Sequence, residues 1–105
     1  PESLRDPTLV AARNRMVADF GVERFVAHQR AAAARPDRTG LLSTFRGAVA
    51  LIGGSHDALF PPALMEALRD ANPGATLTII ANAGHLAPME RPGAFAAALR
   101  TLWSA

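Results

Sequence analysis

The sequence predicts an α/β fold in which helices are followed by a β-α-β-α unit with parallel strands. Two short segments, residues 48–52 and 75–80, consist mainly of apolar and β-branched residues, which favours strands. Helical patterns separate and follow them, and a helix that connects two strands of one sheet makes the strands parallel. The chain before residue 47 has only helical patterns. We therefore predict a helical segment in residues 1–46 and a β-α-β-α part in residues 47–105.

The helical segment contains three predicted helices. Pro7 stands at a plausible helix start, because proline is tolerated in the first turn. Gly21 is expected to close this first helix. The second helix covers about residues 22–34 and stops before Pro36, which cannot donate a backbone hydrogen bond. Asp37 is expected to cap a third, short helix.

Glycine and proline also divide the β-α-β-α part. Residues 48–52 form an apolar run that Gly53 is expected to end, which is typical of a strand buried on both faces. The connecting helix is expected to stop at residues 72–74, Asn-Pro-Gly, and Pro92 to open the last helix. Two strands are too few for a stable parallel sheet. Since the chain also lacks an initiator Met, we expect it to be a piece of a larger protein.

The composition excludes several classes of function. Half of the 105 residues are hydrophobic, which is typical of a folded protein. No stretch reaches the roughly 18–20 consecutive apolar residues that span a bilayer, and no signal peptide is visible, so we expect a cytoplasmic location without membrane association. The absence of cysteine excludes disulfides and thiolate nucleophiles. The three histidines lack the spacing of metal ligands, so neither a metal site nor a cofactor is expected.

The charge pattern does not favour nucleic acid as a partner. The formal net charge is +2, and all eleven basic residues are arginine. They are interleaved with nine acidic residues, without a basic run or an aromatic stripe. Abundant alanine, with arginine in place of lysine, is typical of a GC-rich genome and favours a bacterial source.

Two loops follow the predicted strands at the carboxyl edge of the sheet, where parallel α/β sheets bind ligands. The first carries Asp57 and the second carries His85, each close behind glycine. Because adjacent strand ends lie about 5 Å apart, we expect the two side chains to meet. An imidazole that takes the proton of a nucleophile needs a carboxylate on its other nitrogen. Taken alone, an Asp after a glycine turn is typical of a turn or cap residue, and a loop His of a surface residue; the pairing favours catalysis.

Three stretches resemble the α/β-hydrolase family. "ALIGGSHDALFPP" resembles its acid-bearing strand and loop, and "LTIIANAGHLAPMERPGAFAAALRTLW" is similar to its ending, with an acidic residue before proline. "ERFVAHQRAAAARPDRTGLL" resembles the end of the helical cap in cofactor-free esterase-like and lactonase-like members. The resemblance implies a C-terminal part of this fold. It also implies a nucleophile–His–acid triad, with Asp57 as the acid and His85 as the histidine, in the family's chain order.

The nucleophile of such a triad is not in this chain. No G-x-S-x-G motif surrounds any serine, and the oxyanion-hole loop that the family places upstream is missing. We therefore expect a hydrolase of an ester, lactone or related bond in the full-length protein, acting on a small molecule. The 105-residue chain alone is expected to be inactive. The substrate stays open, because dehalogenases, epoxide hydrolases and carbon–carbon hydrolases share this arrangement.

Four further residues are predicted to line a substrate pocket. If residues 22–34 belong to a cap, Phe25, His28 and Gln29 are placed to face the substrate, together with Leu86 beside the catalytic histidine. His56 is expected to be exposed and to point away from Asp57. Glu90 is expected to organise the entry to the last helix.

The alternative is a non-catalytic module that uses half of a hydrolase fold to form oligomers or bind a partner through a sheet edge. This hypothesis predicts that the natural gene begins near Pro1. In either case we expect the isolated chain to self-associate, because two strands leave unpaired backbone groups and apolar faces.

Overall fold

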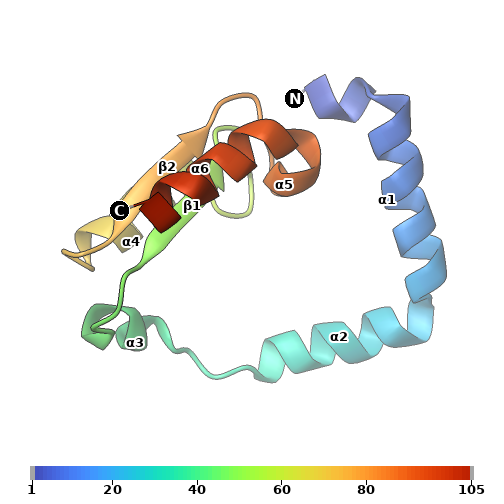
Figure 1. The fold of residues 1–105 in the computed structure, drawn as a ribbon. Helices are drawn as coiled ribbons and strands as arrows, with labels where there is room; N and C mark the ends of the chain where they lie inside the picture. Colours follow the sequence, from blue (N-terminus) through green and yellow to red (C-terminus); the bar gives the residue numbers. More distant parts are fainter. Residues whose placement is uncertain (1, 105) are drawn as a thin grey trace.

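A helical arm precedes a two-stranded parallel sheet and the helices that cover it (Figure 1). The computed structural model describes residues 2–104 of the chain. In Figure 1 two long helices of the arm meet at a corner and lie away from the strands, and a short helix returns the chain to the sheet. The arm consists of η1 (Glu2–Arg5), α1 (Pro7–Phe20), α2 (Val22–Ala34) and α3 (Thr39–Thr44).

Local signals set the ends of the arm's helices. Asp6 Oδ1 accepts hydrogen bonds from the N–H groups of Thr8 (2.9 Å) and Leu9 (3.4 Å), so α1 begins after a capped turn. Gly21 has φ 78°, a conformation that suits glycine, and it separates α1 from α2 as predicted. The predicted cap at Asp37 is wrong. The N-cap residue of α3 is Arg38, so the carboxylate lies one position too early to cap, and no side chain caps this helix.

The strands β1 (Ala50–Gly54) and β2 (Thr76–Ile80) pair in parallel, from Ala50 opposite Thr76 to Gly54 opposite Ile80. Helix α4 (Pro62–Asp70) makes the crossover between them. The first strand is shifted by two residues from the predicted 48–52: it begins at Ala50, and Gly53 and Gly54 continue the ladder instead of ending it. Both glycines are buried.

The sheet is covered on both faces. Met65 of α4 packs against Gly53 and lies on the side of Ile79, whereas Ile80 belongs to a core cluster with Ala83, Ala87 and Phe95. Adjacent residues of a strand point to opposite faces, so α4 and the last helix lie on opposite sides of the sheet, as Figure 1 also shows. The C-terminal elements are α5 (Ala87–Glu90), which the sequence did not predict, and α6 (Pro92–Ser104).

This architecture brings two loops together at one edge. Parallel strands end at the same edge, so residues 55–61 after β1 and residues 81–86 after β2 lie side by side (Figure 1). In the described part of the chain, no helix is both long enough and apolar enough to cross a bilayer.

Candidate active site

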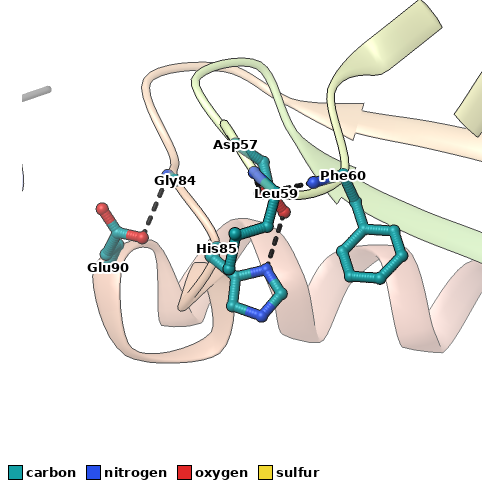
Figure 2. A network of polar contacts seen from close by, with 6 residues as sticks. All are labelled: Asp57, Leu59, Phe60, Gly84, His85 and Glu90. Carbon is teal, nitrogen blue, oxygen red and sulfur yellow. Dashed lines mark hydrogen bonds and ion pairs between the residues drawn. The ribbon is translucent and has the colours of Figure 1, made fainter. Parts of the chain in front are cut away.

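Asp57 has a buried carboxylate whose two oxygens bind different partners. Its exposed fraction is 7%. Oδ1 accepts the N–H groups of Leu59 and Phe60, each at 2.9 Å, which folds the loop after β1 around the side chain (Figure 2). Oδ2 lies 3.0 Å from Nδ1 of His85. The turn role and the catalytic role that the sequence left as alternatives are therefore compatible in one residue.

His85 lies on the loop after β2 with one ring nitrogen on Asp57. An ionised carboxylate can only accept, so Nδ1 donates the proton of this bond, and in the neutral ring Nε2 then has the lone pair. Figure 2 shows the second ring nitrogen directed away from Asp57. The ring stacks on Phe60, with centroids 5.7 Å apart and planes 15° apart. The side chain of His85 is 49% exposed, so Nε2 is accessible to an incoming group.

The environment keeps Asp57 ionised. Burial by itself raises the pKa of its carboxyl, but the hydrogen bonds from Phe60, His85 and Leu59 stabilise the charged form. Their sum holds the pKa of Asp57 below its ordinary value. The carboxylate is thus charged near neutral pH, which is the state that orients a neutral imidazole and stabilises an imidazolium.

The two loops are in direct backbone contact at Gly54. A Cβ there would overlap the carbonyl oxygens of Ala83 and Gly84, so only glycine permits this approach. The sharp turn after β2 is made by Asn82, with φ 55°, and not by a glycine. The missing side chain of Gly54 thus lets the backbones of the two segments approach each other, whereas the sequence suggested that glycine turns the chain.

Glu90 supports the histidine loop from the other side, and sequence reasoning missed this contact. Its Oε2 accepts the N–H of buried Gly84 at 2.9 Å (Figure 2), and the hydroxyl of Ser3 donates to Oε1. Glu90 lies on α5, close to the start of α6, where the sequence placed it. The acidic residue before proline in the family-like ending was the available signal, but its partner six residues upstream was not visible.

A pocket of about 350 Å³ lies beside His85. Its walls come from both parts of the molecule, since residues of α1 lie across it from the loops after β1 and β2. The lining is mostly apolar and includes Leu9, Val10, Leu59, Leu86 and Met89. His56, which is exposed, also reaches this pocket.

The predicted pocket residues divide into two groups. Leu86 lines the pocket next to His85. Phe25, His28 and Gln29 lie on α2, where all three are exposed, and none of them contributes to this pocket. His28 instead makes an edge contact with Phe20, with ring centroids 6.0 Å apart. A substrate-facing role for these α2 residues stays a prediction.

Among the side chains that the structure describes, no three His, Asp or Glu gather in a group that could hold a metal ion. The polar pair that the structure does show at the carboxyl edge of the sheet is the buried carboxylate of Asp57 and the partly exposed imidazole of His85.

Comparison with known proteins identifies the fold family. The sequence model of the alpha/beta hydrolase family matches residues 1–98. The chain belongs to the alpha/beta hydrolase family. The predicted resemblance and the predicted fold class, helices followed by a parallel β-α-β-α unit, are confirmed. No curated protein matches the chain.

Two solved structures resemble this alpha/beta hydrolase chain. A thermophilic esterase from Thermogutta terrifontis is 38% identical over 69% of the chain, with a TM-score of 0.66. Est816, described as an N-acyl homoserine lactone degrading enzyme, is 30% identical over 95% of the chain, with a TM-score of 0.74. The chain spans 26% of the first protein and 41% of the second.

Proposed function

We propose that this chain supplies the acid and the histidine of a nucleophile–His–acid triad in a cofactor-free hydrolase of an ester, lactone or related bond. The observation that carries the proposal is the 3.0 Å contact between Asp57 Oδ2 and His85 Nδ1 at the edge where the family binds substrates. The similarity to an esterase and to a lactone-degrading enzyme supports the same bond class.

In the proposed mechanism, His85 is the general base and then the general acid. Its Nε2 takes the proton of the nucleophile as the nucleophile attacks the carbonyl carbon, and Asp57 stabilises the imidazolium that forms. The same proton then goes to the leaving group. The nucleophile and the oxyanion-hole donors would come from outside the 105 residues, because no G-x-S-x-G motif occurs among them.

The pocket suggests what the substrate presents to this pair. Its lining is mainly apolar, with leucine, valine and methionine side chains beside the charged Arg13 and Glu90, so the group bound near His85 is expected to be largely apolar. At about 350 Å³ the pocket is near the lower end of the roughly 300–1,000 Å³ of small-molecule sites, which favours a small substrate.

The test is turnover of 4-nitrophenyl esters and of simple lactones by the full-length protein that contains this chain. His85→Ala is expected to lower kcat by about 10⁴-fold or more, since removing the histidine of a triad leaves only binding and oxyanion stabilisation. Circular dichroism should show that the variant is folded. Turnover that is unchanged in His85→Ala would reject the proposal and favour the non-catalytic alternative.

A further inference from the structure

A side chain with no role in the proposed chemistry joins the two loops of the site. Ser55 follows β1 directly and is half-buried. Its Oγ accepts the backbone N–H of Asn82 on the opposite loop, at 2.9 Å. Asn82 is the residue with φ 55°, so the hydroxyl holds the apex of the turn that leads to His85.

The Ser55 hydroxyl also contacts the next residue of its own loop. A second hydrogen bond of 2.9 Å joins Ser55 Oγ to Nδ1 of His56. When the hydroxyl proton points to that nitrogen, a lone pair of Oγ is directed to Asn82 N–H. The contact with Asn82 joins the loop after β1 to the loop after β2, whereas the contact with His56 lies within the loop after β1.

Backbone hydrogen bonds from the loop after β1 hold the turn at Ile80 and at Ala83, on either side of Asn82. Ser55 N–H donates to the carbonyl of Ile80 at 2.9 Å, and His56 N–H donates to that of Ala83 at 2.8 Å. Asn82 lies between these two anchors in a left-handed conformation, which asparagine adopts more readily than most residues with a side chain. Asn82 is exposed, and the Ser55 hydroxyl is the protein group that binds its N–H, so this bond ties the apex of the turn to the loop after β1.

We propose that Ser55 is a positioning residue for the Asp57–His85 pair. Its hydrogen bond to Asn82 sets the placement of the loop after β2 relative to the loop after β1. The inference rests on the proposed function. His85 follows the turn by three residues and Asp57 follows Ser55 by two, so a shift between the loops changes the separation of Nδ1 and Oδ2 directly. A misplacement of about 1 Å at a catalytic group can cost about 100-fold in rate.

The experiment compares steady-state kinetics of Ser55 variants in the full-length protein. Ser55→Ala is expected to lower kcat by about tenfold, less than a full 1 Å misplacement, and to leave KM unchanged, because Ser55 does not line the pocket. Ser55→Thr keeps the hydroxyl and is expected to restore most of kcat. Ser43→Ala is the matched control, since the Ser43 hydroxyl bonds only locally to the Gly40 carbonyl on α3, and it should leave both constants unchanged.

Ser55→Cys covers the case in which Ser55→Ala fails to fold. It keeps the side-chain shape with a weaker hydrogen-bonding atom, and kcat should again fall while KM stays constant. Wild-type kcat in the folded Ala or Cys variant, or a change in KM instead of kcat, would overturn the inference. If His85→Ala abolishes turnover while Ser55→Ala does not lower kcat, only this inference fails; if His85→Ala leaves turnover unchanged, the proposed function fails as well.

Discussion

The helical arm and the β-α-β-α unit are stabilised in different ways. Among the described residues of α1 and α2 none is buried, and apolar side chains such as Phe25, 55% exposed, face outward. The unit instead buries Ile80, Ala83 and the Asp57 carboxylate. Local capping and a glycine define the arm, whereas tertiary contacts define the unit. The comparison teaches that the Asp57–His85 contact is built within the unit, while the arm lines the adjoining pocket and reaches the histidine loop through the bond from Ser3 to Glu90.

The largest expected effect lies in the unit, at Asp57. Asp57→Asn keeps the shape of the side chain but no longer offers a charged acceptor to His85, so the imidazole loses its orientation and the stabilisation of its charge. We expect kcat to fall by about 10⁴-fold, as for the equivalent change in a serine protease triad. Asp70→Asn, at an exposed carboxylate paired with Arg69, should retain full kcat. Similar losses in the two variants would contradict a special role for Asp57.

The next effect tests the support of the histidine loop by Glu90. Glu90→Ala leaves the buried Gly84 N–H without its acceptor, which is expected to lower the free energy of unfolding by about 1–3 kcal/mol. Urea denaturation measures this change, with Glu66→Ala on the exposed side of α4 as the control. Equal stability of the two variants would show that the Glu90 contact contributes nothing.

The arm is tested through the pocket wall that it supplies. Leu9→Trp adds side-chain volume on the α1 wall of the pocket. The ratio of kcat/KM for shorter over longer acyl chains should therefore rise by about tenfold, the discrimination that one methylene group gives in an apolar pocket. Val17→Trp places the same side chain on an exposed position of the same helix and should change nothing. Chain-length profiles that match in Leu9→Trp and the wild type would remove α1 from the pocket.

The smallest effect is the acid dependence of stability. Burial opposes the charged form of Asp57, but the hydrogen bonds outweigh it and the pKa is lower in the folded state than in the unfolded chain. The stabilisation is therefore complete above the unfolded pKa, near about 4, and is lost as the pH falls through the lower folded value. Unfolding free energies measured between neutral pH and pH 2 should fall less steeply for Asp57→Asn than for the wild type. Parallel curves would contradict the lowered pKa.

Sequence reasoning predicted features that depend on local signals or on strand order. The helix boundaries at Pro7 and Gly21 follow from capping and backbone preference, and the meeting of Asp57 with His85 follows from two loops at one sheet edge. It failed at Gly53, where pairing in the sheet outweighed the tendency of glycine to end a strand.

The remaining parts of the site depend on contacts that no local pattern encodes. Ser55 bonds a residue 27 positions away, and the carboxylate of Glu90 reaches back to Gly84. The helical pattern of residues 22–34 placed Phe25 toward a substrate, but a pattern does not specify which partner, if any, that side chain contacts. Such contacts emerge only when the loops are placed in space.

The central claim is that Asp57 and His85 form a hydrogen-bonded acid–base pair with the proton on Nδ1. Nuclear magnetic resonance of the ¹⁵N-labelled histidine rings in the full-length protein tests it directly, with the signal assigned by its loss in His85→Ala. The account predicts a downfield proton bonded to Nδ1 of His85 at neutral pH that disappears in Asp57→Asn. A His85 ring that carries its proton on Nε2, or a signal unchanged in Asp57→Asn, would contradict it.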